Sequence, residues 1–491
     1  MSLDDLALIA PLAAAVLVAG AIILADLVKP GSTTVAVGVS LLGLGIVAAL
    51  VVWIGTLPGA AFGGSYRVDD LTTFLHLVFV VIVALTILFG PDYLVPRGLP
   101  VAEFAAILVF ALAGAMLVAA SADLLVLFLG LELMVIPGYL LAGFHKRDAL
   151  STEGAIKYFL LGSFSSAIFL FGLAFVWGLT GSTRIGEVAA VLEQIVEGQA
   201  TLSPGLAMGL AFLTTGVAFK IAAVPFHYWT PDAYQGSPTP ITGYLSVGPK
   251  VGAFALILRV FAEALGPLQE EWLIVIFVLA TLTMTLGNLV ALTQDNVKRM
   301  LAYSSIAHTG YMLVGLAAYA GGQIEGLEGL LFYSAAYAFM NLGAFAVVAA
   351  LQKRPGVTSR LETFAGLGRR EPLLGILMVL FLLSLTGIPP TAGFFAKAYV
   401  ILAAVQGGGW LTLLAVIAVL NAAAAAFYYL RVVVYMYMRE PQVEPAPVGH
   451  GALLRLGLAI TAVMTVTLGL FPGPFLESVE SAAQAVGAAL P

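Results

Sequence analysis

Four lysines and one glutamate lie inside long apolar stretches of the sequence, where a charged side chain is costly. Lys220, Lys250 and Lys397 lie deep in such stretches, and Glu132 lies near the middle of an earlier one. Lys157 lies close to the start of its own stretch. An ammonium at the centre of a bilayer costs at least about 2.5 to 3.5 kcal/mol on insertion scales. These positions therefore indicate a functional requirement.

Proton transfer is the chemistry that one carboxylate and several buried amines can support. A buried lysine loses proton affinity through desolvation and regains it beside a carboxylate, so the charge of one group controls its neighbour. Glu132 is the natural counter-charge of the deep lysines, and the pattern predicts a relay of coupled sites. Two alternatives remain: a closed structural ion pair around Glu132, and a Lys157 that reaches the membrane surface with its long side chain.

Two histidines are further relay candidates. His227 follows Pro225 by two residues, and His308 lies in the segment YSSIAHTGYM. An imidazole can pass a proton between its two nitrogens near neutral pH. A buried histidine can equally be a hydrogen-bonded packing residue, so both interpretations stay open.

The composition indicates a helical protein that crosses a membrane many times. Of 491 residues, 61% are hydrophobic and 10% are charged, and the mean hydropathy is +1.05. So few polar side chains cannot cover a water-soluble enzyme of this size, and so much apolar sequence is not typical of disorder. A net charge of −6 gives no basic field for nucleic acid, and the absence of cysteine excludes thiolate metal sites and cysteine nucleophiles.

The apolar segments predict about fourteen membrane spans. They cover residues 6–28, 34–56, 71–90, 103–120, 122–143, 157–179, 206–235, 242–262, 272–293, 300–320, 328–351, 372–403, 409–437 and 453–471. If the N-terminus lies outside, most of the 21 basic residues fall on the inner side, and only Arg67, Arg184 and Arg259 fall outside. The positive-inside rule therefore predicts that both termini lie outside.

Two of the spans contain prolines beside a deep lysine. Pro225 follows Lys220, and Pro389 with Pro390 precedes Lys397. Proline removes a backbone donor, so we expect the seventh and twelfth helices to be discontinuous there, as in ion-transporting helices. The breaks are five spans apart, and five is odd. This spacing predicts two inverted five-helix repeats, at 103–262 and 272–437, after three N-terminal helices in 1–102 and before a last helix and tail in 453–491.

Several segments resemble the antiporter-like membrane subunits of respiratory NADH-quinone oxidoreductase (complex I), and among them the N-subunit family. They are FLGLELMVIPGYLL, EGAIKYFLLGSFSSAIFLFG, TGVAFKIAAVPFHYWTPDAYQGSPTPITGYLSVGPKVGAF, DNVKRMLAYSSIAHTGYML and LTGIPPTAGFFAKAYV. The stretch SPTPITGYLSVGPK separates this family from its sister M and L subunits. Lys397 also separates it from M, which usually has glutamate there.

The resemblance implies fourteen helices with discontinuous seventh and twelfth helices, and a role for the matching residues Glu132, Lys157, Lys220, Lys250 and Lys397, with a less specific match at His308. It implies no cofactor or metal on this chain, because NADH, FMN, the iron-sulfur clusters and quinone are expected on other subunits. The implied partners are an M-type antiporter-like subunit, small K-, J- and A-type subunits, the lipid bilayer and protons. The implied location is a bacterial plasma membrane.

The expected function is proton translocation coupled to quinone reduction. The first alternative is a cation/proton antiporter subunit of the Mrp type, which would share the broken helices and deep lysines. The second is a structural membrane spacer, whose buried charges would be dispensable for transport.

Overall fold

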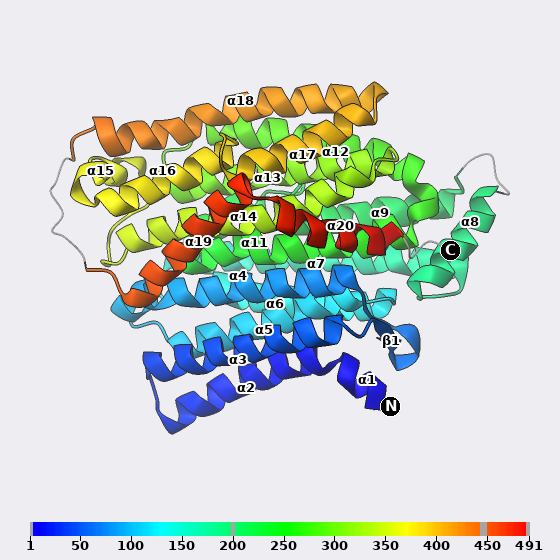
Figure 1. The fold of residues 1–491 in the computed structure, drawn as a ribbon, viewed down its shortest axis with the longest axis horizontal. Helices are drawn as coiled ribbons and strands as arrows, with labels where there is room; N and C mark the ends of the chain where they lie inside the picture. The colour runs from blue at the N-terminus through cyan, green and yellow to red at the C-terminus, as the bar shows by residue number, and fades with distance from the viewer. Residues whose placement is uncertain (1–2, 198–201, 442–448, 488–491) are drawn as a thin grey trace.

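The chain folds into a bundle of long helices in the computed structural model, which describes residues 3–197, 202–441 and 449–487 (Figure 1). The first ten helices are α1 (Leu3–Leu8), α2 (Ala10–Val28), α3 (Thr33–Gly55), α4 (Asp70–Leu94), α5 (Val101–Ala120), α6 (Leu124–Ala142), α7 (Ala149–Thr180), α8 (Ile185–Glu197), α9 (Pro204–Lys220) and α10 (Trp229–Gly236). The other ten are α11 (Thr239–Ile257), α12 (Gln269–Ala291), α13 (Val297–Ala320), α14 (Ile324–Leu351), α15 (Leu367–Arg370), α16 (Pro372–Thr386), α17 (Ala392–Gln406), α18 (Gly409–Met438), α19 (Ala452–Leu470) and α20 (Gly473–Gly487).

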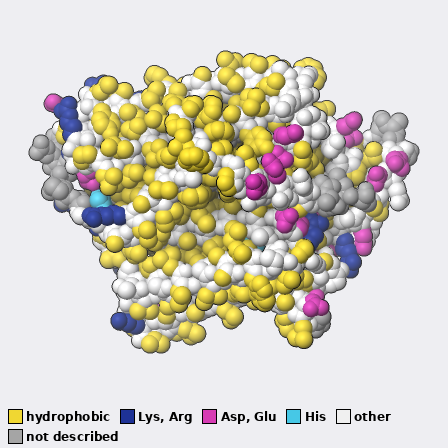
Figure 2. Space-filling view, in the orientation of Figure 1, with side chains coloured by type: hydrophobic (Ala, Val, Ile, Leu, Met, Phe, Trp, Pro, Cys, Tyr) yellow, Lys and Arg dark blue, Asp and Glu magenta, His cyan; other side chains and the backbone are white. Residues whose placement is uncertain are grey.

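The protein is a multi-pass membrane protein. Among the described residues, eleven helices are long and apolar enough to cross a bilayer. The predicted number of fourteen also counts α13 and the two interrupted segments α9–α10 and α16–α17, and it stays a prediction. Figure 2 shows hydrophobic side chains over the middle of the bundle and charged ones mainly toward its two ends, as a surface in contact with lipid requires.

The bundle has two chemically different ends. The terminal end carries α1, the last turns of α20 and a short antiparallel hairpin of β1 (Gly59–Ala61) and β2 (Tyr66–Val68) (Figure 1). At the opposite end, which we call the basic end, Arg97 donates to the carbonyl of Gln352 (2.5 Å) and Lys353 pairs with Asp92 (3.1 Å). These contacts join the last turn of α4 and the turn after it to the connection that follows α14.

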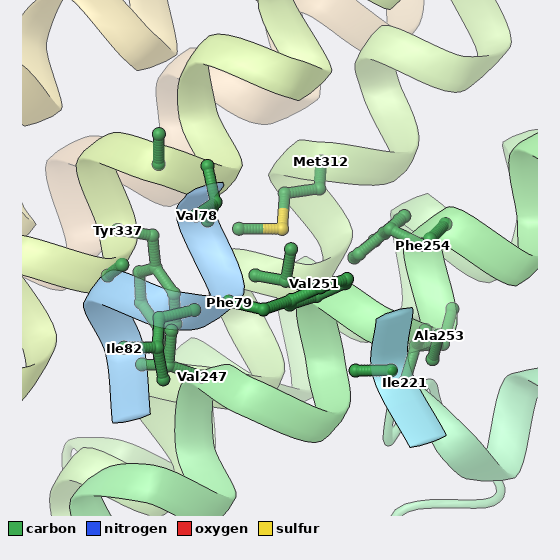
Figure 3. Packing of buried hydrophobic residues seen from close by; sticks show 14 of the residues in the cluster. Val78, Phe79, Ile82, Ile221, Val247, Val251, Ala253, Phe254, Met312 and Tyr337 are labelled. Atoms are coloured by element: carbon green, nitrogen blue, oxygen red, sulfur yellow. The ribbon is translucent and has the colours of Figure 1, made fainter. Parts of the chain in front are cut away.

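Three helices form the interior. Every residue of α11 is buried, and α13 and α14 are buried over nearly their whole length. Figure 3 shows Val251 and Phe254 of α11 next to Met312 of α13, with Phe79 of α4 beside them. Lys250 of α11 and His308 of α13 therefore lie inside a packed protein core, away from the lipid.

Both predicted helix breaks are present. The seventh segment stops at Lys220 and resumes at Trp229, and the twelfth stops at Thr386 and resumes at Ala392. Asp232 lies in the first turn of α10. Three further prolines, Pro91, Pro137 and Pro249, lie inside α4, α6 and α11 and leave these helices continuous.

Candidate functional site

Glu132 and Lys220 form the first part of the site without touching. The Lys220 ammonium at the end of α9 donates to the hydroxyl of Ser166 (2.7 Å) and the carbonyl of Gly162 (3.3 Å), both on α7. The Glu132 charge acts on Lys220, but no ion pair within 4.0 Å joins the two. One carboxylate oxygen of Glu132 is buried without a hydrogen-bond partner. The pair is therefore coupled through space and is not a closed ion pair.

The break after Lys220 is held by hydroxyl groups of neighbouring helices. The carbonyl of Ile221 accepts a hydrogen bond from Thr309 of α13 (2.8 Å), and the amide of Val224 donates to Thr283 of α12 (3.0 Å). Backbone groups that a broken helix leaves without partners are costly in a membrane unless protein or water satisfies them. Side chains of α12 and α13 supply these partners here.

Lys250 lies at the centre of the buried helix α11. Its ammonium donates to the carbonyl (2.5 Å) and to the hydroxyl (2.7 Å) of Ser305 on α13. It also lies 5.6 Å from the ring centre of Tyr337, a distance at which a cation and an aromatic face attract each other.

His308 lies between Lys250 and Lys397. The charges of both lysines act on its imidazole, which is 1% exposed. Its Nδ1 shares a hydrogen bond of 2.6 Å with the hydroxyl of Tyr333, and its Nε2 shares one of 3.2 Å with Tyr429. Both ring nitrogens thus have hydroxyl partners that can donate or accept, which suits either tautomer.

Lys397 caps the second helix break. Its ammonium donates to the last carbonyls of α16, those of Leu385 and Thr386, each at 2.8 Å. It also lies 4.7 Å from the ring centre of Tyr311. The lysine thereby satisfies backbone groups that the break releases.

These residues form one succession, buried except for the half-buried Glu132, that we call the polar row. It consists of Glu132, Lys220, Thr309, Ser305, Lys250, His308 and Lys397. Within the described part of the chain, none of the lysines Lys220, Lys250 and Lys397 has an ion-pair partner, and their hydrogen-bond acceptors are carbonyls and hydroxyls. The row can therefore hold charge that shifts when a neighbouring charge changes.

Lys157 and His227 lie beside the polar row. The side chain of Lys157 is 42% exposed and pairs with Asp232 (2.7 Å) and Glu153 (2.6 Å). Asp232 also pairs with Arg299 at 2.7 Å. His227 stacks on Tyr228 with ring centres 4.7 Å apart, and no described hydrogen bond links it to the lysines.

A cavity of about 780 Å³ opens at the basic end, close to this ion-pair cluster. Its lining includes Arg97, Asp148, Lys298, Arg299 and Arg360. Lys298 is only 3% exposed and donates to the carbonyl of Ser237 at 2.5 Å.

Sequence reasoning missed the neutral members of the site. Ser305 and Thr309 lie one helical turn apart in YSSIAHTGYM, on the same face of α13, and only this spacing next to His308 could have indicated them. The tyrosines around His308 give no signal, because aromatic residues are common in any apolar helix. Among the described residues, no group of three or more histidines, aspartates or glutamates could hold a metal ion.

Comparison with known proteins assigns the chain to a family. Residues 121–421 match the family model described as NADH:quinone oxidoreductase/Mrp antiporter, TM. NADH-quinone oxidoreductase subunit N of Chloroflexus aggregans is 42% identical over 487 residues, which cover 98% of each protein.

Solved structures share the fold. A chain of respiratory complex I from Thermus thermophilus with bound aureothin is 32% identical and has a TM-score of 0.78, covering 96% of this chain and 99% of that one. A chain of the Mrp complex from Dietzia sp. DQ12-45-1b is 22% identical, with a TM-score of 0.84 and full coverage of both. By the family model and the near-complete match to curated relatives, the chain belongs to the antiporter-like family of NADH-quinone oxidoreductase subunit N.

Proposed function

We propose that the chain is a proton-translocating membrane subunit of a NADH-quinone oxidoreductase, and that the ionisable side chains of the polar row form its proton relay. One observation carries this proposal: Lys220, Lys250 and Lys397 are buried in succession with neutral acceptors and without ion-pair partners among the described residues. A structural ion pair would place a carboxylate against each ammonium. Relatives that are subunits of NADH-quinone oxidoreductase support the assembly.

Coupling along the row works through charge. Quinone reduction elsewhere in the complex changes the charge at one end, which shifts the interaction of Lys220 with Glu132 and then the proton affinity of Lys250 and Lys397. Two ammonium groups about 7 Å apart, at an effective dielectric constant near 20, repel by roughly 2.4 kcal/mol. That energy corresponds to about two pKa units, which is sufficient to move a proton.

The proposed orientation places the basic end inside a bacterial plasma membrane and both termini outside, because lysine and arginine accumulate on the inner side. Protons then come in from the basic end, where the cavity and the cluster of Lys157, Asp232 and Arg299 lie. His227 lies at the helix break between this cluster and Lys220, and we assign it to the same uptake route.

Other subunits complete the proposed enzyme. The relatives are subunits of an oxidoreductase, whose NADH, FMN, iron-sulfur clusters and quinone we assign to other chains. An M-type subunit and small K-, J- and A-type subunits are the proposed neighbours in the membrane. Around Glu132, the α6 side chains of Leu129 (63% exposed) and Ile136 (50%) form an open apolar face that such a neighbour or lipid can cover.

The test replaces Glu132 with Gln and Lys220 with Ala in the assembled complex and compares proton pumping with NADH oxidation. We expect both variants to lose most of their pumping. The control is Glu153→Gln, which removes a carboxylate at the surface of neighbouring α7 and should pump nearly normally. Undiminished pumping in both relay variants would reject the relay and favour a structural spacer.

A second candidate function is a cation/proton antiporter subunit of an Mrp-like assembly. The full-length likeness to a chain of the Dietzia Mrp complex favours it as far as the fold goes. Purification separates the two: flavin and iron-sulfur subunits that accompany the chain favour the oxidoreductase. Sodium- or potassium-driven proton movement by a preparation without those subunits favours the antiporter.

A further inference from the structure

The hydroxyl of Thr309 has two carbonyl acceptors and a single proton to donate. One acceptor is Ile221 in the break of the seventh segment, at 2.8 Å. The other is Ser305, one turn earlier in α13, at 3.2 Å. A threonine hydroxyl donates one hydrogen bond at a time, so the two acceptors compete for it.

The carbonyl of Ser305 also accepts a hydrogen bond from Lys250, so Lys250 takes part in this competition. The carbonyl has two lone pairs, and the helical hydrogen bond within α13 occupies one of them. The ammonium of Lys250 approaches the same oxygen at 2.5 Å. When Lys250 is charged, it therefore displaces the weaker neutral donor Thr309, because hydrogen bonds from a charged donor are roughly twice as strong.

We propose that Thr309 is a positioning residue that links the protonation of Lys250 to the helix break beside Lys220. This inference rests on the proposed relay function and adds a physical connection between two of its members. With Lys250 charged, Thr309 donates to Ile221 and holds the break in the observed form. With Lys250 neutral, the Ser305 carbonyl attracts the Thr309 hydroxyl, and the Ile221 carbonyl is released.

The consequence is that Lys250 and the helix break beside Lys220 influence each other through Thr309. Ile221 directly follows Lys220 in the chain, so a release of its carbonyl moves the backbone that carries the Lys220 side chain, and the ammonium responds to the charge of Lys250. Conversely, a shift at the break that removes Thr309 from Ile221 places it in competition with Lys250. The hydroxyl proton stays on Thr309 throughout, and only its acceptor changes.

The test compares Thr309→Val, Thr309→Ser and Thr283→Val in the complete complex, reconstituted into vesicles at equal amounts of assembled protein. Valine has the shape of threonine but no hydroxyl, and serine restores the hydroxyl. Thr283 is the matched control, because it bonds the same break through Val224 and makes no described contact with Lys250 or Ser305. We expect Thr309→Val to lower NADH-driven pumping by about two- to tenfold, the change that one lost hydrogen bond produces. Thr309→Ser should restore it, and Thr283→Val should lose less.

Three results would overturn the inference: normal pumping in Thr309→Val, an equal loss in Thr283→Val, or no recovery in Thr309→Ser. An equal loss would mean that each hydroxyl only stabilises the observed backbone conformation at the break. Lys220→Gln and Lys250→Gln, measured in parallel, test the relay separately. If these lysine variants fail to pump while Thr309→Val pumps normally, the link is rejected and the relay stands; if they pump normally, the relay itself is rejected.

Discussion

Lys157 of α7 and Asp232 of α10 form an ion pair of 2.7 Å across the gap between two helices that are far apart in the sequence. Glu153 and Arg299 extend this pair into a four-residue cluster near the basic end. Lys157 thus has two carboxylate partners, whereas Lys220 has hydroxyl and carbonyl acceptors. The two lysines of neighbouring helices are held by different chemistry, and their substitutions should differ accordingly.

We expect Lys157→Gln to lower NADH-driven proton pumping by less than about twofold, because partly exposed ion pairs contribute little. Lys220→Gln should lower it by at least about tenfold, because the loss of a proton-transferring group is far more costly. Initial pumping rates of reconstituted complexes test this difference. A loss in Lys157→Gln as large as that in Lys220→Gln would place Lys157 in the relay itself.

Tyr333→Phe should slow pumping without loss of assembly. The substitution removes the hydroxyl that shares a 2.6 Å hydrogen bond with Nδ1 of His308, so this ring nitrogen loses the partner with which it could exchange a proton. One hydrogen bond corresponds to a change of about two- to tenfold in rate. Tyr66→Phe is the control, since it removes a buried hydroxyl without a hydrogen-bond partner at the terminal end. Equal pumping by the two variants would contradict a role for Tyr333.

The sequence predicted the scaffold of the site because a bilayer restricts what a chain can do. Spans must be long and apolar, and the breaks at Pro225 and Pro390 follow from the missing backbone donors. Charged residues are so rare here that Lys220, Lys250 and Lys397 are evident by position alone. The structure confirms the breaks and the burial of these three lysines.

The contacts around the lysines could not be predicted in the same way. Ser305 and Thr309 add little free-energy cost to an apolar helix, so their presence alone does not indicate a function. The partners of Lys157 include Asp232, which is 75 positions away, and only the tertiary structure brings the two together. Arg259, which the charge pattern places on the outer side, is fully buried, and it bonds the Ala119 carbonyl at the end of α5 and the carboxylate of Asp69 just after β2.

Arg259 and Glu263 lead to a prediction on stability. They pair at 2.6 Å within the π-helical turn Leu258–Ala264 that continues α11, and both are at most 1% exposed. Arg67 contacts Glu263 (2.6 Å) and Asp69 (2.8 Å), so two arginines face two carboxylates. Burial alone would lower the pKa of Arg67, but the attraction of Glu263 and Asp69 raises it above its ordinary value, and the guanidinium stays charged.

Replacement of Glu263 alone by Met should destabilise the protein by about 3 to 5 kcal/mol, because it leaves an uncompensated buried charge. The double replacement of Arg259 and Glu263 by Met leaves the pair of Arg67 and Asp69, whose charges still balance, and should recover much of the stability. The measurement is thermal unfolding of the purified complex with both single variants and the double variant. A double variant as unstable as Glu263→Met would show that the charge balance is not what holds this end together.

Gly387 should affect pumping through the position of Lys397. This glycine ends α16 with a φ of +92°, and a Cβ there would lie 3.0 Å from Cδ of Lys397, closer than an ordinary contact.

Alanine at a positive φ costs about 1 to 2 kcal/mol wherever it occurs. Gly322 has a φ of +89° with open space around its Cβ position, so Gly322→Ala carries the same backbone strain without the contact. We therefore expect both variants to lower thermal stability similarly and only Gly387→Ala to lower pumping, because it displaces the ammonium from the Leu385 and Thr386 carbonyls. If both variants pump at equal rates per assembled complex, the observed position of Lys397 is not required for translocation.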